Sequence, residues 1–270
     1  MDLVATVALL LVAGALIGFL GGVVGIGGGL LAIPFLVLVM GFEQQAAQGS
    51  ALLMVLPAVL LTLYNYHKMA PIPLRQALAG ASTSVVFTWF GAKVALGLDP
   101  IRLQYIYAGF IFCLALYYFY QSKYGIKRVG KTAKASDNHN TDAQDGNPVN
   151  AYSGYHFMLV GMLSGTAGGI FAVGGSVVVV PLLTTVFGFS QFRAQALGLT
   201  MIVPGIIVAI LTYAYHGQVY ASAGLPLAVG SLLMVPLGVR VAYRLAESRL
   251  RFIFGLTLLG ITFLMFSSVR

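Results

Sequence analysis

The sequence predicts an all-α integral membrane protein made of two inverted-topology repeats, and three observations lead to this prediction. Of the 270 residues, 59% are hydrophobic and only 8% are charged, whereas about 25% charged residues is usual in a soluble domain. Several apolar runs approach the roughly 20 residues that a membrane-spanning helix needs. The chain also matches itself at an offset of 147 residues, which indicates a duplication.

The residues that match between the two halves are mainly glycines and prolines. At this offset the matched pairs are Gly14 with Gly161, Gly18 with Gly165, Gly22 with Gly169, Gly28 with Gly175, Pro34 with Pro181, Gln48 with Gln195 and Pro57 with Pro204. The match divides the chain into a first transmembrane repeat, 1–121, a linker, 122–153, and a second transmembrane repeat, 154–270. The linker is polar and poor in aliphatic residues, so we expect it to be solvated and disordered.

Each repeat is expected to open with an apolar stretch broken by glycines and to continue with three spanning helices. We predict these helices at 45–66, 77–97, 101–121, 193–215, 225–243 and 250–268. Six of the nine residues in 21–29 are glycines, and each glycine in a helix costs about 1 kcal/mol relative to alanine, so the helix should break there.

Two arrangements of the broken stretches fit, giving 8–10 membrane segments in total. The arms beside the breaks are about 13 residues long, roughly 20 Å as helix, which is less than the ~30 Å hydrocarbon core. Ten crossings with some short segments is one arrangement. Six full helices plus two re-entrant hairpins is the other, and we favour it because non-helical backbone at this depth must be covered by protein or line a cavity.

The basic residues predict the orientation of the repeats. With an odd number of crossings per repeat, 12 of the 15 Lys and Arg residues fall on the cytoplasmic side. With an even number the division is 8 inside and 7 outside, so the positive-inside rule favours inverted repeats. We therefore expect a multi-pass protein of the cell inner (plasma) membrane, with a cytoplasmic linker and both termini periplasmic.

The glycine-rich tips of the two hairpins are the predicted anion site. Hairpins from opposite faces would meet near the midplane, and helices starting near Gly29 and Ser176 would direct amide groups and partial positive charge at an anion. The expected substrate-binding residues are Gly25, Gly27, Gly28, Gly29, Gln48, Ser50, Gly174, Gly175, Ser176, Gln195 and Thr200. The alternatives are that glycines spaced by four, such as Gly14 and Gly18, pack helices, and that hydroxyls and amides bond their own helix.

Four ionisable residues near helix ends are candidates for a charge or proton role. His67 and His216 each close a Tyr-x-Tyr-His sequence, and Lys93 and Arg240 are matched cations. A histidine near each mouth could carry a coupled proton. Interfacial anchoring by tyrosine and snorkelling of the cations to the headgroups are the alternative interpretations.

The sequence disfavours several other classes of protein. No acidic residue lies deep in a predicted helix, which argues against a cation pump. We find no nucleophile, carboxylate pair or metal cluster for a membrane enzyme, and we predict no metal and no cofactor. The basic residues lie between apolar runs, where they set orientation rather than bind nucleic acid. The expected partners are a small anion and the lipid bilayer; a proton is a candidate coupling ion, and a homodimer is left open.

Four features together carry a resemblance to a known family. They are the glycine-rich segment 18–29 followed by Pro34, the sequence Ala47-Gln48-Gly49-Ser50, the Tyr-rich segment before a short basic loop, and the duplicated second half. With these features the chain resembles the TauE/SafE sulfite exporter family of membrane permeases. The resemblance implies a secondary transporter that exports small sulfur-containing anions, such as sulfite, sulfoacetate or other organosulfonates, by alternating access. A passive anion channel and a transporter of a different small anion are the alternatives.

Overall fold

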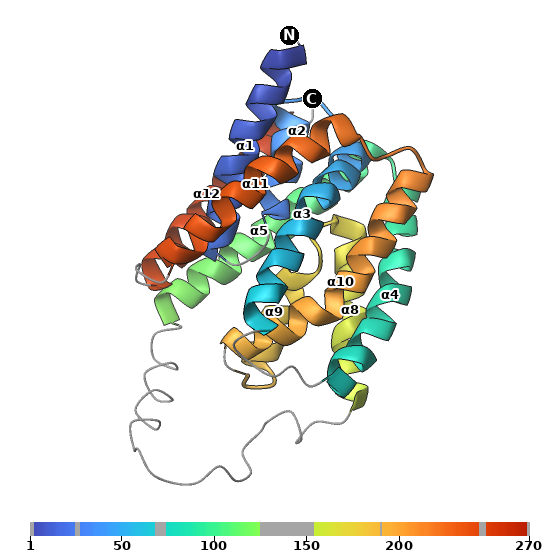
Figure 1. The fold of residues 1–270 in the computed structure, drawn as a ribbon, viewed down its shortest axis with the longest axis vertical. Coiled ribbons are helices and arrows are strands. Elements are labelled where there is room, and N and C mark those ends of the chain that lie inside the picture. Colours follow the sequence, from blue (N-terminus) through green and yellow to red (C-terminus); the bar gives the residue numbers. More distant parts are fainter. Residues whose placement is uncertain are drawn as a thin grey trace.

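The computed structural model describes residues 3–24, 28–67, 74–124, 154–189, 191–242 and 247–268. Within these ranges all regular structure is α-helical, which confirms the predicted all-α class (Figure 1). In the first repeat the helices are α1 (Leu3–Val24), α2 (Gly29–Leu38), α3 (Gln44–His67), α4 (Leu74–Gly97) and α5 (Pro100–Tyr124). In the second they are α8 (Gly154–Phe171), α9 (Ser176–Thr185), α10 (Gln191–Tyr215), α11 (Ala221–Ala242) and α12 (Glu247–Ser268).

The six long helices after the hairpins begin and end within four residues of the predicted bounds. Helices α1, α3, α5, α10 and α11 contain segments long and apolar enough to cross a membrane. Helix α4 is absent from this set although it has 24 residues. It carries Arg75, Lys93 and several hydroxyl residues, and its buried face is a stripe of small and polar side chains that includes Ser84 and Thr88.

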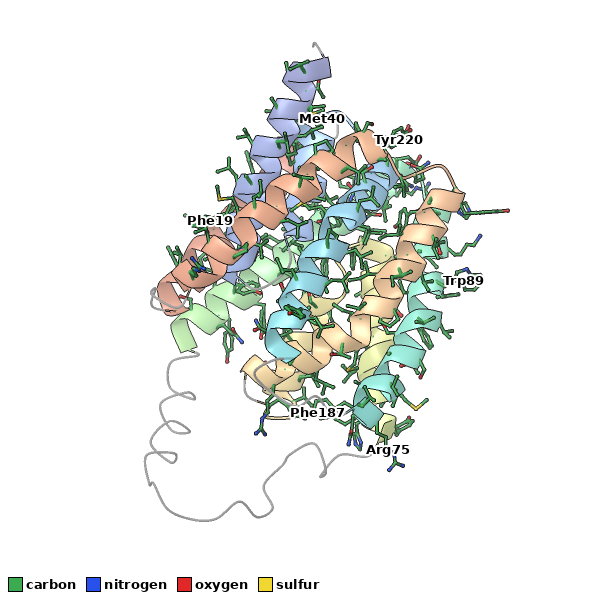
Figure 2. The ribbon with its side chains drawn as sticks, in the orientation of Figure 1. Phe19, Met40, Arg75, Trp89, Phe187 and Tyr220 are labelled. Carbon is green, nitrogen blue, oxygen red and sulfur yellow. The ribbon has the colours of Figure 1, made fainter. Side chains whose placement is uncertain are left out.

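The second arm of each hairpin is short. Helices α2 and α9 have 10 residues each, which corresponds to about 15 Å, or half of the hydrocarbon thickness. Figure 2 places Met40, which follows α2, at one end of the bundle and Phe187, which follows α9, at the opposite end. The two hairpins therefore open toward opposite ends. Both chain termini lie at the Met40 end (Figure 1), and the orientation of that end in a membrane stays a prediction.

The long arm of each hairpin packs against a helix of the other repeat. Helix α1 lies along α11, and α8 lies along α4. A Cβ atom built on Gly14, Gly18 or Gly22 would overlap the backbone of Leu227, Ser231 or Val235, respectively. Likewise Gly161, Gly165 and Gly169 lie against Gly80, Ser84 and Thr88, the counterparts of those residues at the offset of 147. Glycines spaced by four thus let these helix backbones approach closely.

The linker prediction concerns residues that mostly fall outside the described ranges. Helix α5 continues to Tyr124, slightly beyond the expected end of the first repeat, and α8 begins at Gly154. The segment 125–153 lies outside the described residues. Across the repeats, α5 also contacts α12 and α3 contacts α10, so the two halves share one core.

Gly18→Ala is expected to lower the free energy of unfolding by about 1–3 kcal/mol, because its methyl group would have to displace the α11 backbone. The new Cβ would lie 2.5 Å from the Cα of Ser231. The matched control is Gly109→Ala on α5, where an added Cβ meets no atom within 4 Å. That change should be neutral or stabilising, since alanine favours a helix. Thermal unfolding in detergent measures both variants, and equal melting temperatures would contradict the packing role.

Candidate functional site

The ends of the two hairpins, here called the first tip (Gly28–Gly29) and the second tip (Ala172–Gly175), lie against each other. A Cβ built on Gly29 would be 3.8 Å from the Ala172 carbonyl oxygen and 3.8 Å from the Cα of Val173. Val55 of α3 lies beside both tips, because its side chain would meet a Cβ on Gly29 and a Cβ on Gly174. All residues of both tips are buried. Two helix breaks thus share one interior location.

The N-terminus of a helix lies at each tip. Gly28 and Gly175 precede α2 and α9 with φ values of 76° and 73°, a left-handed conformation that glycine adopts readily. Neither helix has a side-chain cap hydrogen bond. The Leu31 and Val178 amides donate to the Gly28 and Gly175 carbonyl oxygens at 3.1 Å and 3.0 Å. The first two amides of each helix have no intrahelical acceptor, and each N-terminus carries about half a positive charge. The predicted residues Gly25 and Gly27 lie outside the described residues.

Hydroxyl groups gather around the second tip. Ser176, the first residue of α9, is 3% exposed, and its Oγ has no hydrogen-bond partner. A small cavity lies beside this tip, and its lining includes Ser84, Thr88, Ser164, Gly168, Gly174 and two isoleucines of α10. Sequence reasoning missed the three hydroxyl residues of the cavity. The available signal for Ser84 and Thr88 was their spacing by four on α4, the long helix of the first repeat without a segment apolar enough to cross a membrane. Ser164 lies on α8.

Gln48 belongs to a buried hydrogen-bond group that joins three helices. The Tyr213 hydroxyl lies 2.9 Å from Gln48 Oε1 and 3.2 Å from the Gly169 carbonyl oxygen, so it donates to one of these two acceptors at a time. Gln48 Nε2 is buried without a partner. Tyr213 is fully buried, whereas Tyr64 and Tyr215 are exposed. Tyr213 therefore connects α10, α3 and α8 inside the bundle instead of anchoring an interface.

Ser50 and Thr200 form hydrogen bonds with residues outside the tips. Ser50 Oγ accepts a hydrogen bond of 3.0 Å from the backbone N–H of Tyr220, in the connection before α11. Thr200 Oγ1 donates to the Ala196 carbonyl of its own helix at 2.8 Å, which is the common bond of a helical threonine. Gln195 is half-buried near the start of α10. The structure thus brings Gly28, Gly29, Gly174, Gly175 and Ser176 together.

The candidate charged residues lie at the periphery. Lys93 Nζ is 3.3 Å from His216 Nε2, and His216 Nδ1 is 2.8 Å from the Thr212 carbonyl oxygen. This geometry suits a neutral imidazole that donates through Nδ1 and accepts from the Lys93 ammonium. Arg240 is exposed in the last turn of α11, where a cation favours the helix dipole. The side chain of His67 lies outside the described residues.

The electrostatic character of the interior follows from this distribution. Every Lys, Arg and His side chain that the structure describes is exposed. Every helical Lys and Arg lies within four residues of a helix end. The tips therefore offer an anion only neutral donors, namely backbone amides and hydroxyls.

Comparisons with known proteins indicate a membrane transporter. The family model described as sulfite exporter TauE/SafE matches residues 10–265. A probable membrane transporter protein of Methanocaldococcus jannaschii is 22% identical over 268 residues, which cover 94% of this chain and 92% of the relative. Probable membrane transporter proteins of two Xylella fastidiosa strains are each 24% identical over 254 residues, covering 92% of this chain and 90% of the relatives. No solved structure matches the chain.

Tyr213→Phe is expected to lower the free energy of unfolding by about 1 kcal/mol, the usual size of a buried hydrogen bond in a membrane protein. It leaves both Gln48 amide atoms without a partner. Tyr215→Phe is the control, since Tyr215 is 88% exposed. Melting temperatures in detergent compare the two variants, and an equal effect of both would show that the buried hydroxyl does not connect the helices.

Proposed function

Because this chain belongs to the sulfite exporter TauE/SafE family, we propose that it is a secondary transporter that exports small sulfur-containing anions. The family and the names of the relatives indicate a membrane transporter. Sulfite, sulfoacetate and other organosulfonates are the substrates that we propose. The family description and the anion-binding character of the tips support this choice.

The observation that carries the proposal is the juxtaposition of two uncapped helix N-termini in the buried interior. An anion loses its hydration there, and an isolated ion in a low-dielectric medium is very unfavourable. Amide groups that are already oriented replace the lost water without further reorganisation. A sulfonate or sulfite head group has three oxygen atoms, so one anion could accept hydrogen bonds from both tips. Glycines at the tips let the backbone approach it closely.

The proposed mechanism is alternating access around the tips. The hairpins open toward opposite ends of the bundle (Figure 2), so movement of one hairpin would expose the shared site to its own end while the other hairpin keeps its end closed. This is the general behaviour of transporters built from inverted repeats. The prolines within α2 and α9, Pro34 and Pro181, shorten the hydrogen-bond ladder of both arms and favour such movement.

Gly28→Leu is expected to reduce uptake of radiolabelled sulfite into proteoliposomes by at least about tenfold, because it removes close backbone approach to the anion and displaces Met54. A Cβ at Gly28 would lie 2.8 Å from Met54 Cε. Gly41→Leu is the matched control: Gly41 also has a positive φ, 69°, but faces open space. It carries the same backbone strain, on the order of 1–2 kcal/mol, away from the tips. Equal uptake by the two variants would contradict the proposed site.

A pH gradient distinguishes a proton-coupled transporter from a passive anion channel. For a coupled transporter we expect an imposed gradient to drive accumulation of the anion above its equilibrium level, and His216→Gln tests the histidine at the rim. A channel only lets the anion reach equilibrium. Intravesicular anion measured with and without the gradient, at a clamped membrane potential, gives the answer. Accumulation that follows the anion gradient alone would favour the channel.

A further inference from the structure

Two hydroxyl residues of α4 and one of α8 converge on the cavity beside the second tip. Ser84, Thr88 and Ser164 are 1%, 3% and 0% exposed, and all three line it. Ser84 Oγ has no hydrogen-bond partner in the protein. A Cβ built on Gly205 of α10 would lie 3.0 Å from Ser84 Oγ and 2.8 Å from Thr88 Oγ1, so this glycine leaves the space that both hydroxyls face.

The corresponding place beside the first tip is largely apolar. At the offset of 147, Ser84 corresponds to Ser231, Thr88 to Val235 and Ser164 to Ile17. Ser176 at the second tip likewise corresponds to Gly29. Both places perform the same packing task, since Gly18 lies against Ser231 as Gly165 lies against Ser84. Packing alone therefore does not require the extra hydroxyls of the second tip.

An unpartnered buried hydroxyl lowers stability, because it leaves water without gaining a hydrogen bond. At position 235, the counterpart of Thr88, the chain has valine, which has a similar shape and no hydroxyl. The polar residues at 84 and 88 thus call for a ligand that accepts their hydrogen bonds. The cavity has room for about one water-sized group, which matches a single oxygen atom of an oxyanion.

The partial positive charges of the two helix N-termini at the tips determine how much negative charge a bound ligand can carry. Two helix N-termini, each with about half an elementary charge, together balance about one negative charge. No described Lys, Arg or His side chain is buried to balance a second. The Born cost of burial rises with the square of the charge, so a dianion costs about four times as much to desolvate as a monoanion of equal size.

We propose that Ser84 and Thr88 form an oxygen-binding subsite beside the second tip, and that the tips and this subsite together select monovalent oxyanions. The inference rests on the proposed function of anion transport and specifies its substrate: hydrogensulfite and simple alkanesulfonates rather than sulfate. It also predicts that sulfoacetate is transported less well than simple alkanesulfonates, because sulfoacetate carries a second negative charge on its carboxylate. Ser84 and Thr88 donate to the bound oxygen, whereas the Ser164 hydroxyl donates to the Gly161 carbonyl oxygen at 3.2 Å and lines the same cavity.

The test compares proteoliposomes that contain wild type, Ser84→Ala, Thr88→Val or Ser231→Ala. Ser231→Ala is the matched control, because Ser231 is equally buried and its Oγ also has no partner. Initial uptake of radiolabelled methanesulfonate is measured over a range of concentrations, with sulfoacetate and sulfate at the same pH. Melting temperatures in detergent show whether each variant is folded.

For methanesulfonate we expect kcat/KM to fall at least about tenfold in Ser84→Ala and in Thr88→Val, the usual effect of losing a hydrogen bond to a charged group. Ser231→Ala should keep the wild-type value, and Ser84→Ala should melt no lower than wild type. Wild type should prefer methanesulfonate to sulfoacetate and sulfate by at least about tenfold.

Two different failures are distinguishable. If wild type transports no anion, the proposed function fails, and the subsite fails with it. If wild type transports methanesulfonate while Ser84→Ala and Ser231→Ala behave alike, only the subsite is overturned. Equal transport of sulfate and methanesulfonate by wild type would overturn the selection of monovalent anions.

Discussion

The need to shield unpaired backbone groups from lipid shapes this protein. A helix that stops inside the hydrocarbon layer leaves polar amides and carbonyls, which are tolerated there only under protein or in a cavity. Here each break covers the other, with Gly29 against Ala172 and Val173. Such mutual cover requires the hairpins to open toward opposite ends and their long arms to lie deep in the bundle. The glycine contacts of α1 with α11 and of α8 with α4 hold these long arms close to the rest of the bundle.

The same arrangement supports the proposed anion site although the interior holds no described cation. Shielding from lipid leaves the first amides of α2 and α9 directed into a shared interior, and oriented dipoles act strongly where water is excluded. The cations remain at helix ends, as Lys93 does beside His216. An interior of fixed dipoles can release its ligand more easily than one with a buried arginine, because full charges bind an anion more tightly.

Much of the helical frame could be predicted from the sequence, because it depends on local pattern. Apolar runs and glycine clusters gave helix bounds within four residues of those observed. The hydroxyl subsite could not be predicted in the same way. Ser84 and Ser164 lie within helices, where a serine most often bonds its own backbone. Their convergence depends on the contact of α4 with α8. Ser50 contacts Tyr220, 170 positions away, whereas Thr200 bonds only its own helix.

The exchange of packing partners between the repeats has a consequence for biosynthesis. Helix α1 leaves the ribosome early, yet the surface of α11 that receives its glycines is translated only after all the described helices between them have been made. Until then the close-packing stripe of α1 can only face lipid or another nascent helix. Completion of the core therefore waits for α11, and the first half on its own lacks the surface that would hold its own hairpin.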